Sequence, residues 1–226
     1  SLAVTLAGKC IGHIKPITCV LFHSLGEMVL TASKDVASCA RNLLWDWRRG
    51  SEMALLPTAS GLPSSVAAPK VICRSCCFSP SKPDVIFTLQ SGQRGSAYVT
   101  EWKFAQAATA VGTTGEGDRG HKQGDGDVDT KFSVRAVRVK RVSPHPATSM
   151  SVRNDGVRLA VANVEGTVIV YRLPGFAKVM EYRAHDLPVT GLGFTPDGAS
   201  VALGGYDLLA GSADYKITLL KSQGES

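Results

Sequence analysis

The sequence lacks the long hydrophobic segments that characterise membrane proteins and secreted precursors. No apolar run approaches the roughly 18 residues that a membrane-spanning helix requires. The apolar stretch from Leu2 to Leu6 is too short for a signal peptide and has no basic residues before it. Asn-X-Ser/Thr glycosylation sites are also absent. These absences predict no membrane span within the chain and favour a reducing compartment.

The familiar catalytic motifs are missing as well. There is no Walker A motif, no G-x-S-x-G nucleophile elbow and no H-E-x-x-H zinc helix. Gly115-x-Gly117-x-x-Gly120 matches the dinucleotide-binding pattern literally, but no helical pattern follows it to meet a phosphate. The sequence therefore predicts no catalytic residue and no cofactor.

Metal-binding patterns are incomplete. Cys73-x-x-Cys76 has no second C-x-x-C or H-x-x-x-H to complete a tetrahedral zinc site. The Asp triplet that starts at Asp125 resembles a calcium loop but has Thr130 in place of the turn Gly and Ala136 in place of the bidentate Glu. No metal site is predicted, and the six cysteines are interpreted as free thiols, with those of Val71–Phe78 acting as small buried hydrophobes.

Composition indicates an ordinary globular chain with a basic bias. Apolar residues make up 44% of the 226 residues and charged residues 19%, which excludes disorder of the whole chain. The formal net charge is +6. This excess predicts either an acidic partner or simply a mildly basic surface.

An internal repeat is the main positive feature of the sequence. Gly12–Phe22 aligns with Ala184–Phe194 at an offset of 172 residues, which is four times 43. Blades of WD-type propellers repeat every ~40–45 residues. Further copies end at Phe78 and Val152, so the anchor spacings are 56, 74 and 42 residues.

These copies predict an all-β fold. Each unit contains strand, turn, strand, turn and strand, with turns at Leu25-Gly26, Ser79-Pro80, Asn154–Gly156 and Pro196–Gly198. We expect residues 1–226 to form one partial WD-repeat β-propeller with about four blade units. A seven-bladed ring needs ~300 residues at this period, so the chain is interpreted as the C-terminal part of such a ring. Residues 57–69 are expected to form a loop, and residues 105–130 a flexible Gly-rich insertion.

The His and Asp residues of the repeats have a structural interpretation. Gly12-His13 with Trp45-Asp46 forms the GH…WD signature once, and His185 occupies the place of His13 in the last unit. Asp35 and Asp207 align in the tight turns that follow. Such residues hold propeller strands in register, so we expect a structural role for them and not a catalytic one.

The densest basic stretch runs from Arg135 to Arg141 and alternates with valines, as in a strand. One hypothesis is a docking stripe for an acidic partner or for anionic lipid head groups, formed by Arg135, Arg138, Lys140 and Arg141. The alternative is an outer edge strand that its charges protect from pairing with other chains.

Five segments resemble one branch of the WD-repeat superfamily, the endoplasmic-reticulum guanine-nucleotide exchange factors of COPII assembly, or prolactin regulatory element-binding protein family. The matching segments are Cys73–Phe78, Ala97–Trp102, Gly166–Tyr171, Tyr182–Thr190 and Asp214–Leu220. The resemblance implies a seven-bladed propeller on the cytoplasmic face of the endoplasmic reticulum, or in the cytoplasm. It also implies that the propeller opens the nucleotide site of a Sar-type small GTPase in ER-to-Golgi transport, without covalent chemistry.

Two expected features of that family have no counterpart in this sequence. These are the Gly-rich, Lys-containing exchange loop of the first blade and the C-terminal membrane anchor. Such a loop upstream of Ser1 and an apolar segment of ~20 residues after Ser226 would favour this family. No functional residue is carried over, and exchange activity rests on the resemblance alone. The alternatives are a generic WD scaffold for other proteins and, third, a propeller that uses the basic strand to contact nucleic acid, for which the basic residues are too sparse.

Overall fold

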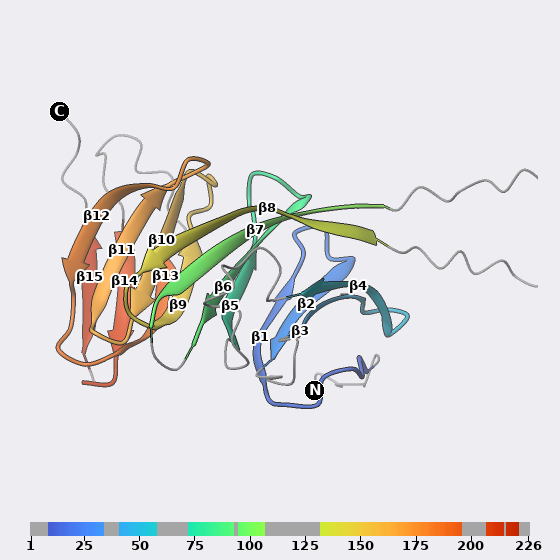
Figure 1. The fold of residues 1–226 in the computed structure, drawn as a ribbon, viewed down its shortest axis with the longest axis horizontal. Helices are drawn as coiled ribbons and strands as arrows, with labels where there is room; N and C mark the ends of the chain where they lie inside the picture. The colour runs from blue at the N-terminus through green and yellow to red at the C-terminus, as the bar shows by residue number, and fades with distance from the viewer. Residues whose placement is uncertain are drawn as a thin grey trace, which may run out of the picture.

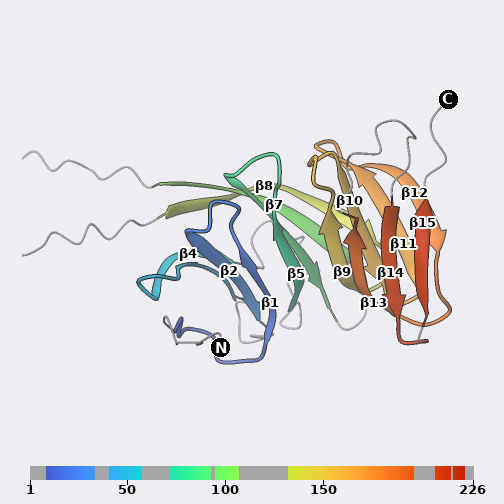
Figure 2. The same cartoon turned by 180° about the vertical axis from the view of Figure 1, so that it is seen from behind.

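The described part of the chain is built entirely from strands. The computed structural model describes residues 9–33, 41–57, 72–92, 95–106, 132–195, 207–214 and 216–221. These residues form fifteen strands grouped in four antiparallel sheets (Figure 1). Neighbouring sheets pack face to face, as the blades of a β-propeller do (Figure 2). The predicted all-β, partial propeller fold is confirmed.

Each sheet follows the chain order, so each is one blade. Blade 1 contains β1 (Ile17–Phe22), β2 (Met28–Ser33), β3 (Arg41–Asp46) and β4 (Ser51–Pro57). Blade 2 contains β5 (Ile72–Phe78), β6 (Val85–Ser91), β7 (Ala97–Gln106) and β8 (Phe132–Ser143). Blade 3 contains β9 (Ala147–Val152), β10 (Arg158–Asn163), β11 (Thr167–Arg172) and β12 (Ala177–Arg183). Blade 4 has three strands, β13 (Val189–Phe194), β14 (Asp207–Ser212) and β15 (Ile217–Lys221).

The second strand of a blade is buried on both faces. All residues of β2, β6 and β10 are buried. Their sequences are therefore nearly continuous apolar runs without the alternation of a half-exposed strand. Tight turns precede two of these strands, with Gly26 and Gly156 both at a φ of 71°. A side chain is strained in that backbone conformation, so glycine is favoured at both turns.

Separate apolar clusters fill the spaces between blades. Trp102 and Leu30 belong to the cluster between blades 1 and 2, and Tyr171 and Val99 belong to the cluster between blades 2 and 3. A smaller cluster around Val189 joins blades 3 and 4. Stability therefore comes from blade-to-blade contacts and not from one central core.

Hydrogen bonds also join the innermost strands of successive blades. Thr18 Oγ1 donates to the Cys73 carbonyl at 3.1 Å, and Ser75 Oγ donates to the Met150 carbonyl at 3.5 Å. The Phe194 amide donates to Ser151 Oγ at 3.4 Å. The first strands of all four blades are thus connected in sequence order.

The sequence predicted three strands in each unit, but three of the four blades have four strands. The expected three strands are present, but β4, β8 and β12 add a fourth, outer strand to blades 1, 2 and 3. Of these, only the basic segment of β8 was predicted as an outer strand. Several predicted features lie outside the described residues. They are Asp35, the turn at Pro196–Gly198, the predicted loop apart from Pro57, and the predicted insertion from residue 107 onward.

Candidate protein-interaction surface

His13 and Trp45 of the GH…WD signature form a hydrogen-bond network with Thr31 in blade 1. Trp45 Nε1 donates to Thr31 Oγ1 at 2.8 Å, and His13 Nε2 lies 2.7 Å from the same hydroxyl. The Thr31 hydroxyl is 3.4 Å from the Leu43 carbonyl, to which it donates. Because the network ties the segment before β1 to β2 and β3, the expected structural role of His13 is confirmed.

Blade 2 repeats this network with different residues. Trp102 Nε1 donates to Thr88 Oγ1 at 2.8 Å. Gln90 Nε2 donates to the same hydroxyl at 3.2 Å, and Thr100 Oγ1 donates to Gln90 Oε1 at 2.9 Å. Sequence reasoning missed Thr88 and Gln90. The signal was available, since Thr and Trp are separated by 14 residues in both blades.

A histidine–aspartate pair lies in blade 4. His185 is 5% exposed, and its Nδ1 lies 3.3 Å from Asp214 Oδ2. Its Nε2 lies 3.0 Å from the Ala210 carbonyl. Asp207 begins β14. The structural role of His185 is therefore confirmed with Asp214 in the acid position.

The comparison with known families agrees with these networks. The family model described as WD domain, G-beta repeat matches residues 5–35 and 176–219. The chain carries WD repeats. The two matched segments include His13 and His185. The first covers β1 and β2 of blade 1, and the second covers β12 of blade 3 and most of blade 4. No curated protein matches the chain.

The WD propeller presents its predicted docking residues on an edge strand. β8 is the outermost strand of blade 2 and pairs only with β7 in the described part of the chain. Edge protection requires this outermost position, and docking of a partner is compatible with it. The placement therefore confirms an edge strand without deciding between docking and edge protection.

A β-bulge divides the basic residues between two faces of β8. Arg135, Arg138 and Lys140 pair with Lys103, Glu101 and Val99, which alternate along β7. Residues opposite each other in an antiparallel pair share a face. The register shift near Val137 therefore brings Arg135 onto the face of the other two. This face is directed toward blade 3, because Val99 belongs to the cluster between blades 2 and 3.

Arg141 lies on the opposite face, and Arg138 is already engaged. Arg141 pairs with Tyr98, so it points away from blade 3. Arg138 Nη1 donates to the Pro174 carbonyl in the β11–β12 turn, and its guanidinium carbon lies 6.0 Å from the centre of the Phe176 ring. Phe176 is 2% exposed. Arg138 thus connects blade 2 to blade 3 and is the least available of the four residues.

We call the remaining exposed cations, Arg135, Lys140 and Arg141, the basic edge. None of them forms an ion pair with another residue in the part of the chain that the structure describes. Some other surface cations are neutralised, since Lys178 lies 2.7 Å from Glu181 and Lys103 lies 3.5 Å from Asp84. Positive charge without a counter-charge suits an acidic protein surface.

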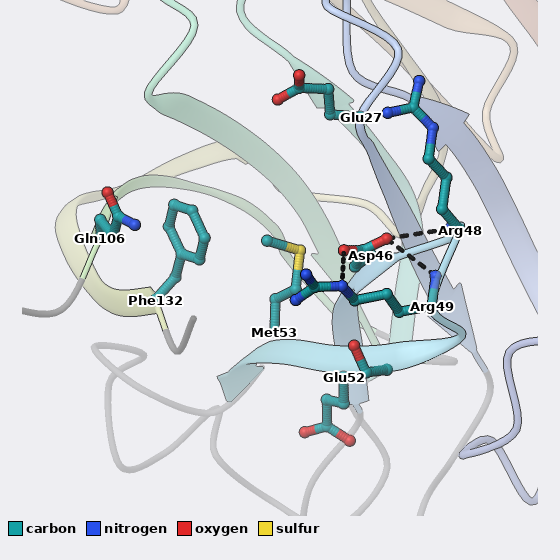
Figure 3. A pocket seen from close by; sticks show the side chains of 9 residues that line it. Glu27, Asp46, Arg48, Arg49, Glu52, Met53, Gln106 and Phe132 are labelled. Atoms are coloured by element: carbon teal, nitrogen blue, oxygen red, sulfur yellow. Dashed lines mark hydrogen bonds and ion pairs between the residues drawn. The ribbon is translucent and has the colours of Figure 1, made fainter. Parts of the chain in front are cut away.

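A surface cavity lies where β7 and β8 reach over blade 1 (Figure 3). The cavity has a volume of about 530 Å³ and is lined by Glu27, Asp46, Arg48, Arg49, Ser51, Glu52, Met53, Gln106 and Phe132. Asp46 accepts the backbone N–H of Arg48 and of Arg49 at 3.0 and 3.1 Å, so it caps the β3–β4 turn. Because three carboxylates outnumber two guanidinium groups here, the cavity does not extend the basic edge.

The described residues lack two other kinds of feature, metal-ligand clusters and membrane-spanning helices. No cluster of three His, Cys, Asp or Glu side chains there could hold a metal ion. The described residues also include no helix with the length and hydrophobicity needed to cross a bilayer.

Proposed function

We propose that this WD propeller segment is a docking module whose basic edge binds an acidic surface of a partner protein. The observation that carries the proposal is the charge of Arg135, Lys140 and Arg141 on an exposed outer strand, which no carboxylate of the described residues neutralises by an ion pair. WD repeats serve as protein-interaction scaffolds, and exposed charges at an interface rim increase the association rate and select the partner.

The partner we propose is a Sar-type small GTPase, with the propeller acting in nucleotide exchange for COPII vesicle formation on the cytoplasmic face of the endoplasmic reticulum. The sequence resemblance supports this choice. Its segments include most of β5, part of β7 and most of β11, together with the turn that contains His185. They are framework elements, so they support the fold of that family more directly than its activity.

The test is binding and nucleotide release with the purified chain and a Sar-type GTPase. We expect micromolar binding that weakens as salt rises, because salt screens exposed charges. We also expect faster release of a fluorescent GDP analogue in the presence of the chain. Absence of binding at low salt would contradict the choice of partner.

A generic scaffold without exchange activity is the second candidate. It is favoured by the structural use of His13, His185 and Trp45, which leaves no predicted functional residue apart from the basic edge. Binding of the GTPase without faster GDP release would support this candidate. The same pair of measurements therefore separates the two functions.

A further inference from the structure

Two cysteines on the innermost strands of neighbouring blades are in contact. Cys19 lies on β1 of blade 1 and Cys76 on β5 of blade 2. The Cys19 thiol donates to the Cys76 carbonyl at 3.6 Å, and the two thiols are also hydrogen-bonded to each other. Both belong to the apolar cluster between blades 1 and 2. The fold therefore brings together two sulfur atoms that are 57 residues apart in the sequence.

The two thiols differ in the way that a reactive pair requires. Cys19 is partly exposed, whereas Cys76 is 2% exposed. The side-chain hydrogen bond with Cys76 lowers the pKa of Cys19 to about 7 despite partial burial. The same hydrogen bond, together with burial, raises the pKa of Cys76. A thiolate is the nucleophilic form of cysteine, so Cys19 is the attacking group and Cys76 the resolving one.

The neighbouring cysteines are poorer candidates. Desolvation by burial raises the pKa values of Cys73 and Cys77. Cys77 packs against the cluster between blades 2 and 3, on the side of β5 away from Cys19. Cys10 is exposed, but burial and the nearby charge of Asp46 raise its pKa.

We propose that Cys19 and Cys76 form a peroxide-sensitive dithiol that closes into a disulfide between blades 1 and 2. The Cys19 thiolate attacks one oxygen of hydrogen peroxide, the O–O bond breaks and hydroxide leaves, so that the sulfur is oxidised to a sulfenic acid. The Cys76 sulfur then attacks the Cys19 sulfur. An S–S bond forms, the S–O bond breaks, and the leaving hydroxide takes the Cys76 proton as water.

A disulfide between Cys19 and Cys76 would link the first strands of blades 1 and 2 covalently. β1 and β5 are held together by side-chain hydrogen bonds such as that of Thr18 with the Cys73 carbonyl. A covalent link in parallel with these bonds limits the separation of blades 1 and 2 in partly unfolded states. We therefore expect the oxidised chain to unfold at a higher temperature than the reduced chain.

The test is treatment of the full chain, in a Cys10→Ser background, with hydrogen peroxide followed by mass spectrometry. The substitution removes the other cysteine from the tryptic peptide that contains Cys19. We expect an intact-mass decrease of about 2 Da and a cross-link that joins Cys19 to Cys76. Before oxidation, the alkylation rate of Cys19 should rise with pH around a midpoint of about 7. In the described residues, the thiols of Cys73, Cys76 and Cys77 interact electrostatically with Cys19, the last from the other side of β5.

The matched controls are Cys77→Ser, which should leave the cross-link intact, and Cys76→Ala, which should abolish it and let Cys19 accumulate as sulfenic acid. Alanine is chosen because it places no polar group in the apolar cluster. A cross-link of Cys19 to Cys73 or Cys77, or no cross-link in the folded chain, would overturn the proposal.

Discussion

Reversing the charge of the basic edge is expected to weaken binding to the Sar-type GTPase by about 100-fold. The variant carries Arg135→Glu, Lys140→Glu and Arg141→Glu. Each reversal removes a favourable charge contact and adds a repulsive one, and three rim contacts of about 1 kcal/mol correspond to roughly this change in affinity. Calorimetric titration at low salt measures the effect, which should shrink as the salt concentration rises.

Arg138→Ala is the matched control for that variant. Arg138 lies on the same strand but donates to the Pro174 carbonyl and contacts Phe176. Its removal should leave affinity within about threefold while lowering the free energy of unfolding by about 1 kcal/mol. If the triple variant binds normally but self-associates in light scattering, the charges protect the edge and do not dock a partner.

Trp102→Ala is expected to lower the free energy of unfolding by about 3–5 kcal/mol. Trp102 is 1% exposed and fills the cluster between blades 1 and 2. Truncation leaves a cavity there and also removes the 2.8 Å hydrogen bond to Thr88. Urea unfolding followed by circular dichroism measures the change.

Trp102→Phe separates the two contributions. The ring is kept in part and only the indole N–H is lost, so we expect a loss of about 1–2 kcal/mol. Equal stability of the Ala and Phe variants would mean that blade packing contributes less than the Thr88 hydrogen bond, contrary to the structure described above.

The repeat pattern predicted the blades because the signals are local. The Gly of the turns at Gly26 and Gly156, and the Trp residues on β3 and β7, are each recognisable within a few residues. The outer strands β4 and β12 lack such signals. All residues of β12 except Met180 are exposed, so no apolar periodicity identifies that strand. Among the described side chains of β4 only Ala54 and Leu56 are buried, which is too few to show a period.

The candidate surface was predicted less completely than the fold. The basic residues and their strand were recognised, but alternation alone could not place Arg135 beside Arg138, because the bulge near Val137 shifts the register. The engagement of Arg138 depends on Pro174 and Phe176, which follow 36 and more residues later. The roles of Gln90 and Asp214 likewise depend on contacts between strands.

Hydrogen–deuterium exchange of the chain with and without the GTPase tests docking through the basic edge most directly. Docking there predicts slower exchange of backbone amides within Phe132–Ser143, where β8 has no second neighbouring strand in the described residues. Exchange in the innermost strands β1, β5 and β9 should stay unchanged. Protection of those inner strands with no change in β8 would contradict docking through the basic edge.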